Sequence, residues 1–457
     1  MDESRWTRLE VLLTRNGLVR AADIARELGV NQSTVSRLLA DVGARVVRIG
    51  RARAARYALA RNIGRAGSHW PLYRINAEGR AELLGELHAL SGEHFWFESS
   101  GQRPAFLHGD FANGVFPGVP WFLDDQRPQG FLGRAFGRRV AADINANPDI
   151  LLWNVDDIVL ALLRHGDDAP GDLVLGETSL QQALQRIIEP ADAIRAADRA
   201  NEYPRRAEAA LRGENFGSSA GGEQPKFALT LLDDKAARPV IVKFTERIET
   251  PGARRWADLL IAEHLAGVTL RDFGLAAADS EIFEAGGRLY LQSTRFDRTP
   301  ARGRQGFVSL FALDAAYYGH GRIDWWRFAP ELERDGWIDA ESARRLRLYS
   351  WFGTLISNSD MHLANAALQL TDERPLRLLP AYDMLPMHFR PAASGEVVER
   401  HYEIRLPTPE HRDDWQEAAR IALLFWERTA DEQRISPGFR ELAGEARSAL
   451  DRAIQRS

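Results

Sequence analysis

The sequence predicts an α+β protein in which a winged helix-turn-helix head precedes a two-lobed body with a mostly helical C-terminal lobe. Three observations lead to this prediction. Short helical segments fill residues 5–40, apolar strands joined by a turn follow at 227–244, and an apolar helix at 343–356 leads into a polar loop. The chain of 457 residues has room for about three domains. We place boundaries at 1–62, 63–213, 214–299 and 300–457.

Composition limits the classes of protein that the chain can represent. With 45% hydrophobic and 27% charged residues, ordinary cores can form. The absence of cysteine excludes disulfides and thiolate metal sites and agrees with a reducing cytoplasm. Neither a signal-like apolar start nor an apolar run of 18 residues occurs, so secretion and membrane spanning are not expected. We therefore expect a cytoplasmic protein.

Charge is distributed unevenly along the chain. Residues 1–60 carry 11 arginines and 6 acids, a net +5, whereas the remainder has a net charge of −10. A basic head on an acidic body indicates that contact with nucleic acid is confined to the head.

The head begins with a pattern typical of a helix-turn-helix. A helix at 21–28 ends at Gly29, and a further helix starts at Gln32. Four apolar residues can share one small core: Ile24, Leu28, Val35 and Leu38. In bacterial regulators with this layout the second helix enters the major groove of DNA. The polar residues that would face the groove are Gln32, Ser33, Thr34, Ser36 and Arg37.

An arginine-rich hairpin follows these helices. Residues 45–49 and 54–59 read as strands around the turn at 50–53, which makes a wing. Its arginines would contact the phosphate backbone: Arg48, Arg51, Arg53 and Arg56. The alternative is a small protein-binding or dimerisation domain whose basic face is simply solvated.

The middle segment, residues 63–213, carries no chemistry that the sequence reveals. A strand is expected at 69–75, turns and irregular packing at 114–137, and helices at 155–164 and 179–211. His94 and His108 lack partners at metal-ligand spacing, so we interpret them as packing residues.

The next segment has the residues of a nucleotide-binding lobe. A Gly-rich turn with Gly221 and Gly222 permits close approach to a phosphate. Only three lysines occur in the chain, and two of them, Lys226 and Lys243, stand in this segment where a phosphate contact is wanted. Lys243 ends an apolar strand, which is the position of the kinase lysine that holds the α- and β-phosphates.

Two further residues complete this lobe. The helix at 254–266 offers Glu263 as an ion-pair partner for Lys243, although Glu263 could equally be a surface acid. The strand ending at Gln292 is expected to enter a hinge whose backbone binds adenine.

The polar loop at 358–365 holds the most informative spacing in the chain. Asp360 can accept the proton of an attacking hydroxyl. Asn365 and Asp383 can both hold Mg²⁺ on ATP phosphates, because this hard cation prefers oxygen ligands. A hairpin at 366–379 is expected to bring the second acid beside the first. This order of residues predicts phosphoryl transfer with ATP and Mg²⁺.

At these residues the chain resembles the HipA-type serine/threonine kinase toxins of bacterial toxin–antitoxin systems, over roughly residues 105–400. The Thr-Asp-x-His-x-x-Asn loop of that family stands here as residues 359–365, and its Tyr-Asp element as residues 382–383. The resemblance implies a two-lobed protein-kinase-like fold, with Asp360 as the catalytic base, Asn365 and Asp383 as Mg²⁺ ligands and Lys243 on the ATP phosphates.

The resemblance also implies autophosphorylation and partners. Family members phosphorylate a serine at the start of the Gly-rich loop, which corresponds to Ser218 or Ser219; the two alignments remain open. Their substrates include translation components such as aminoacyl-tRNA synthetases, and a homodimer is an open possibility. A head in the same chain looks like the self-contained branch of the family, so the need for a separate antitoxin is left open.

We therefore expect an ATP- and Mg²⁺-dependent serine/threonine protein kinase with a DNA-binding head, growth-inhibitory when unrestrained. Two alternatives remain at this point. One is a transcriptional regulator whose kinase-like body senses a nucleotide, and the other is a small-molecule kinase.

Overall fold

The N-terminal head consists of three helices and a small sheet. This computed structural model describes residues 3–190, 192–213, 224–233 and 237–456. The head comprises α1 (Glu3–Asn16), β1 (Val19–Arg20), α2 (Ala21–Leu28), α3 (Gln32–Val42), β2 (Val46–Ile49) and β3 (Arg56–Leu59), with strand order β1-β3-β2. Gly29 ends α2 with a φ of 65°, in the left-handed region that glycine adopts without strain. The expected helix boundaries and hairpin are confirmed.

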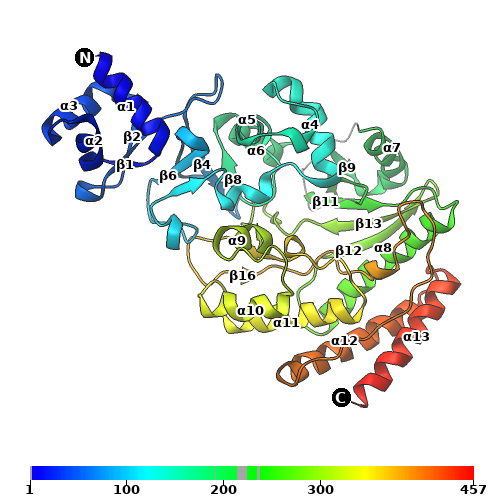
Figure 1. Cartoon of the computed structure of the whole chain (residues 1–457). Coiled ribbons are helices and arrows are strands. Elements are labelled where there is room, and N and C mark those ends of the chain that lie inside the picture. The colour runs from blue at the N-terminus through cyan, green and yellow to red at the C-terminus, as the bar shows by residue number, and fades with distance from the viewer. Residues whose placement is uncertain (1–2, 191, 214–223, 234–236, 457) are drawn as a thin grey trace.

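Two clusters of buried apolar residues stabilise the head. Ile24, Leu28, Val35 and Leu38 are buried together, as expected. On the other side of the hairpin, Ile49 and Ala58 pack against Leu90, which belongs to the next sheet. This second cluster joins the hairpin to the neighbouring sheet, and Figure 1 shows the head beside the part of the chain that carries β6.

The middle segment forms a five-stranded antiparallel sheet with helices. The strands, in the order β7-β6-β5-β4-β8, are β4 (His69–Ile75), β5 (Ala81–Ala89), β6 (His94–Ser99), β7 (Val115–Pro117) and β8 (Leu173–Leu175). The helices are α4 (Gly130–Ile144), α5 (Val155–His165), α6 (Glu177–Ile188) and α7 (Arg199–Leu211). The strand expected at 69–75 and the helix expected at 155–164 are confirmed.

Two expectations for this segment are wrong. Part of the stretch 114–137 is helical, because α4 already begins at Gly130. The single helix expected over 179–211 is divided into α6 and α7 by β9 (Ala193–Arg195), which pairs in parallel with the following sheet. Pro190 lies in the interruption and cannot donate the main-chain hydrogen bond that a continuing helix needs.

The next part of the chain forms a second five-stranded sheet with one long helix. Its order is β12-β13-β11-β10-β9, with β10 (Lys226–Leu232), β11 (Ala237–Phe244), β12 (Ser280–Ala285) and β13 (Arg288–Thr294), and the helix is α8 (Pro251–Asp272). Lys226 and Lys243 stand directly opposite each other on β10 and β11. Their side chains therefore leave the same face of the sheet.

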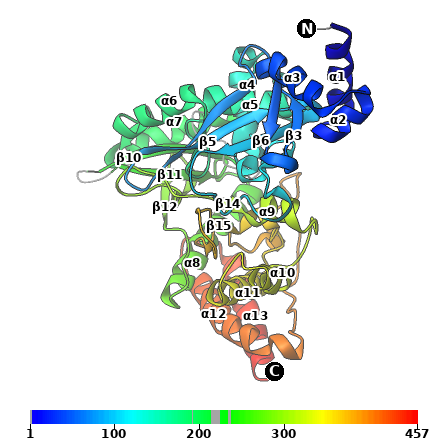
Figure 2. The same ribbon diagram turned by 90° about the vertical axis from the view of Figure 1, so that its left-hand side faces the viewer.

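The C-terminal lobe is mostly helical. It contains β14 (Val308–Ser309), α9 (Leu310–Tyr317), α10 (Trp325–Arg334), α11 (Ala340–Leu355), β15 (Ala367–Gln369), β16 (Arg377–Leu378), α12 (Arg412–Asp431) and α13 (Pro437–Ile454). Figure 2 shows α8 and α10–α13 on one side of the molecule and the two larger sheets on the other. Within the described ranges, no helix has the length and apolar character needed to cross a bilayer.

Candidate active site

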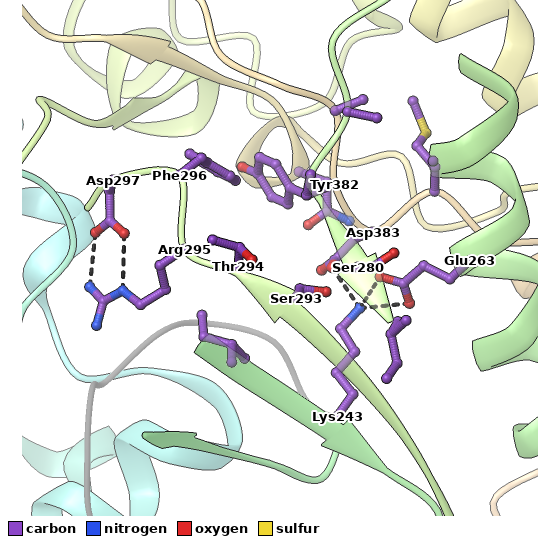
Figure 3. Close-up of a pocket in the computed structure, with 18 of the residues that line it drawn as sticks. Lys243, Glu263, Ser280, Ser293, Thr294, Arg295, Phe296, Asp297, Tyr382 and Asp383 are labelled. Atoms are coloured by element: carbon purple, nitrogen blue, oxygen red, sulfur yellow. Dashed lines mark hydrogen bonds and ion pairs between the residues drawn. The ribbon is translucent and has the colours of Figure 1, made fainter. Parts of the chain in front are cut away.

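A cavity of about 390 Å³ lies between the sheet of strands β9 to β13 and the loop that follows α11. Residues from both lobes line it, among them Lys226, Lys243, Glu263, Ser293, Thr294, Phe296, Asn365, Tyr382 and Asp383 (Figure 3). The segments that the sequence placed far apart therefore meet at one cavity.

Lys243 stands at the centre of a charged cluster in this cavity. Its Nζ donates to Glu263 Oε1 at 2.6 Å and Oε2 at 2.8 Å, and to Asp383 Oδ1 at 2.6 Å. Burial alone would lower the pKa of Lys243, but the two carboxylates raise that pKa above its usual value. The side chain is 8% exposed and stays a cation. Glu263 is thus a partner of Lys243 and not a surface acid.

Asp383 is held in an unusual backbone conformation. Its φ is 54°, in the left-handed region that costs a residue other than glycine free energy unless the surroundings impose it. Burial would raise the pKa of its carboxyl, but the charges of Lys243 and Lys226 lower it below the ordinary range. The carboxylate is therefore ionised and available as an oxygen ligand.

Asn358 connects the two acids. Its Nδ2 donates to the main-chain oxygen of Asp383 at 3.1 Å, and its Oδ1 accepts from the main-chain nitrogen of Asp360 at 3.1 Å. Tyr382 donates to the main-chain oxygen of Ala364 at 2.7 Å. The sequence motif includes Asn358 and Tyr382, but their connecting roles were not predicted. The bonds donated by Asn358 Nδ2 and by Tyr382 join the loop at 358–365 to the segment that carries Asp383.

The donor set fits a magnesium ion shared with a phosphate ligand. Asn365 Nδ2 donates to the main-chain oxygen of Asp360 at 2.7 Å, which leaves the amide oxygen for another partner. Asn365 and Asp383 line the same cavity. Across the described ranges no group of three or more His, Cys, Asp or Glu side chains forms a metal site. Asn365 and Asp383 offer two side-chain oxygens, and Mg²⁺ usually takes one or two oxygens from a protein and completes its shell with phosphates and water.

Asp360 faces a second cavity, on the other side of the same loop. This cavity of about 890 Å³ is lined by polar residues that include Asp360, His362, Arg322, Asp324, His388, Glu403 and Arg405. The Asp360 side chain is 51% exposed, and His362 also lines the first cavity. The loop thus separates a nucleotide-sized cavity from a polar cavity in which a hydroxyl can approach Asp360.

Gln292 and residues of the Gly-rich turn were also predicted to belong to the nucleotide site. Gln292 does not line the cavity: its Oε1 accepts from Tyr203 and Arg199 on the opposite face of β13. Its neighbours Leu291 and Ser293 face the cavity, because side chains alternate along a strand. The side chain of Gln292 therefore faces away from the cavity, and the expectation that the backbone at this strand end binds adenine stays a prediction. Gly221, Gly222, Ser218 and Ser219 lie outside the described residues.

The residues predicted to contact DNA lie on the head. Gln32, Ser33, Ser36 and Arg37 are exposed on α3, and Arg48 and Arg51 are exposed on the hairpin. Thr34 is only half-exposed, and its hydroxyl donates to Asn31 Oδ1 at 2.8 Å, at the cap of the helix. Arg53 lies in the turn Ala52–Ala54 between the strands. Thr34 therefore contributes to the helix start more than to an open polar surface.

Sequence comparisons identify relatives over most of the chain. A family model described as the HipA-like C-terminal domain matches residues 218–452, and one described as the YjjJ-like toxin, middle domain, matches residues 66–184. Toxin YjjJ of Escherichia coli (strain K12) is 36% identical over 427 residues, which is 93% of each chain.

Solved structures give a weaker likeness. The Shewanella oneidensis MR-1 toxin–antitoxin system of HipA, HipB and operator DNA matches with a TM-score of 0.48 at 14% identity, over 84% of this chain and 97% of that one. The Helicobacter pylori proinflammatory kinase CtkA matches with a TM-score of 0.37 at 13% identity, over 53% of this chain and 93% of that one.

Proposed function

Because this chain belongs to the HipA-type toxin family, we propose that it is an ATP- and Mg²⁺-dependent serine/threonine protein kinase that inhibits growth from the cytoplasm. The observation that carries the proposal is the ion-paired cluster of Lys243, Glu263 and Asp383 in a cavity beside Asp360. A protein that only binds a nucleotide does not need an exposed carboxylate on the far side of the same loop.

In this proposal ATP occupies the cavity between the lobes. Adenine binds near the end of β13, where Thr294 and Phe296 line the cavity and the Phe296 ring lies 5.5 Å from that of Tyr382. Lys243 binds the α- and β-phosphates, with Glu263 keeping its ammonium in place. Lys226, opposite Lys243, adds a second positive charge to the same wall.

Transfer of the phosphoryl group needs few covalent steps from the protein. Asp360 accepts the proton of a serine or threonine hydroxyl as the hydroxyl oxygen forms a bond to the γ-phosphorus. The bond from that phosphorus to the bridging oxygen breaks, and ADP leaves. Asn365 and Asp383 would hold Mg²⁺, which when bound offsets the negative charge of the phosphates. Asn358 keeps the two acids at a fixed separation.

Several finer features belong to the same proposal. Ser218 or Ser219 is the autophosphorylation site, as the family resemblance implies, and a translation component such as an aminoacyl-tRNA synthetase is a protein substrate. The head is a winged helix-turn-helix that binds DNA, supported by the exposed polar residues of α3 and the arginines of the hairpin. A nucleotide-sensing regulator and a small-molecule kinase are the competing assignments.

Incubation with γ-labelled ATP and Mg²⁺, followed by intact-mass and peptide analysis, tests the proposal. We expect label on Ser218 or Ser219 of the wild type, and loss of about 100-fold or more in Asp360→Asn because the variant lacks the proton acceptor. Asp451→Asn, on the exposed surface of α13, serves as the matched control and should keep full transfer.

The outcomes separate the assignments. ATP turnover without labelled protein indicates a small-molecule kinase, and no ATP consumption indicates a regulator. Undiminished labelling in Asp360→Asn, with an unchanged unfolding midpoint, would show that the assignment of Asp360 is wrong.

A further inference from the structure

A small cavity lined by arginines lies behind the nucleotide lobe. It measures about 60 Å³ and is bounded by residues of α6, β10 and β11 and by the segment that follows β13. Five arginines line it: Arg186, Arg295, Arg298, Arg302 and Arg304. Neither Arg295 nor Arg298 has a role in the proposed kinase chemistry.

Three of these arginines are already paired with carboxylates. Arg295 donates to Asp297 and to Asp168, each at 2.8 Å (the Asp297 pair is visible in Figure 3). Arg298 contacts the same two aspartates, at 2.8 and 3.0 Å. Arg186 pairs with Asp167. Asp192 also lines the cavity, and its Oδ1 lies 3.8 Å from Arg186 Nη1. The ion pairs of these aspartates are thus made with Arg186, Arg295 and Arg298.

Arg304 has no carboxylate partner within the described ranges. It is 4% exposed, and its Nη2 donates only to the main-chain oxygen of Asp167. Its Nη1 is buried and has no hydrogen-bond partner among the described residues. Burial, and then the positive charge of Arg298, lower the pKa of Arg304 to about 9. Asp168 and Asp297 offset this lowering only in part, and neither is a hydrogen-bond or ion-pair partner of Arg304, so its buried Nη1 lacks a direct acceptor among the described residues.

Arg302 provides a second cationic group at the mouth of the cavity. It is exposed, and its Nη1 donates only to the main-chain oxygens of Ile187 at 3.2 Å and Ile188 at 3.3 Å. Main-chain carbonyls orient a guanidinium but do not neutralise it. Two arginines at one cavity thus retain their full positive charge.

We propose that this cavity is a binding site for a phosphate group, held by Arg304 and Arg302. The planar guanidinium, with its fork of N–H donors, matches the oxygens of a tetrahedral oxyanion. The volume admits a phosphate group but not a nucleoside. The phosphate is either free inorganic phosphate or the end of a larger phosphorylated ligand whose remainder stays outside.

The proposed phosphate site lies where the middle segment contacts the end of β13. Arg295 lines both this cavity and the nucleotide cavity, and Asp168, which it contacts, lies on the segment between α5 and β8. A bound phosphate would therefore stabilise the contact between the middle segment and the end of β13. The inference does not depend on catalysis by Asp360.

Thermal unfolding of the full chain, with potassium phosphate titrated against potassium chloride at equal ionic strength, tests the site. The nucleotide cavity is kept filled with a non-hydrolysable ATP analogue and Mg²⁺, so that phosphate cannot act there. We expect a saturable rise in the unfolding midpoint of the wild type. In Arg304→Met and in Arg302→Gln the apparent phosphate affinity should fall about tenfold, the effect of losing a charge-assisted hydrogen bond.

Arg288→Gln is the matched control. Arg288 is also buried and also donates to a main-chain oxygen, that of Thr245, but it lies at the other end of β13. Its phosphate response should equal that of the wild type. If Arg304→Met does not fold, Arg302→Gln decides the result, because its side chain is exposed. The same midpoint rise in wild type and both cavity variants would overturn the proposal, since general salt stabilisation would explain it.

A second arm identifies the source of the phosphate. The titration is repeated with phosphoserine in place of inorganic phosphate, again with Arg302→Gln as the comparison. Tighter binding of phosphoserine indicates a phosphorylated ligand, and equal binding indicates the free ion. No response to either compound, in the wild type with the nucleotide cavity filled, would also contradict the site.

Discussion

Asp125 is a partly buried carboxyl that lines the cavity between the two lobes. Its Oδ2 accepts from the main-chain nitrogen of Ser309 at 2.7 Å. Burial nevertheless raises the pKa of Asp125 to about 6, because the bond to Ser309 only partly offsets the loss of water. The folded chain therefore holds this proton at a pH where the unfolded chain has released it.

We predict that this group makes the protein less stable as pH rises from about 4 to about 6. The protonated form contributes stability that is complete below the unfolded pKa and is lost as pH rises through the folded pKa, about 3 kcal/mol in all. Asp125→Asn keeps the acceptor oxygen and removes the titration. Its free energy of unfolding, measured with urea at pH 5 and pH 8, should exceed that of the wild type by more at pH 8. An equal difference at both pH values would contradict the assignment.

At the residue scale, the expected meeting of Lys243, Asn365 and Asp383 is found, whereas the roles of these residues stay predictions. Lys243, Asp360, Asn365 and Asp383 follow from residue type and spacing, and the geometry brings Lys243, Asn365 and Asp383 to one cavity beside Asp360. The Gln292 side chain lies on the face of β13 away from the cavity, because successive side chains of a strand point to opposite faces. The link through Asn358 depends on main-chain positions that spacing alone does not determine.

Among the elements, α8 places Glu263 against Lys243 and depends on its N-cap. Thr250 Oγ1 accepts from the main-chain nitrogen of Ala253 at 3.1 Å, and Pro251 starts the helix. Thr250→Ala should lower the free energy of unfolding by about 1 kcal/mol, because one main-chain donor loses its partner. Denaturation by urea measures this loss. Thr250→Ser retains the oxygen and should behave as the wild type; an equal loss in both variants would show that the cap is not the cause.

Elements made from residues without strong strand preference were not predicted. The strand β5 has the sequence AELLGELHA, which is rich in residues that favour helices. It forms a strand because β4 and β6 pair with it on both sides. Gly85 fits there because a Cβ at this position would lie 2.0 Å from the main-chain oxygen of Glu98. Pairing with neighbouring strands depends on the whole sheet and cannot be read from the segment itself. The patterns that predict α2, α3 and β4 lie within those segments, and these elements were predicted closely.

At the scale of the whole molecule, the charge asymmetry and the attachment of the head act together. The first sixty residues have a net charge of +5 and the remainder −10. The hairpin of the head is packed against Leu90, so the basic residues keep a fixed direction relative to the body. An acidic body repels DNA, which favours contact through the head alone.

We predict that DNA binding by the full chain depends on salt through the head arginines. Arg37 on α3 and Arg51 on the hairpin are exposed, and each phosphate contact releases condensed counterions. Replacing either by alanine should reduce the slope of log affinity against log salt concentration by about 0.9, the value for one lost contact. Fluorescence anisotropy with labelled duplex DNA, at several potassium chloride concentrations, measures the slope. Arg205→Ala, an exposed arginine on α7, should leave it unchanged. If all three variants keep the wild-type slope, these arginines do not contact DNA, and the basic head is then a protein-binding surface.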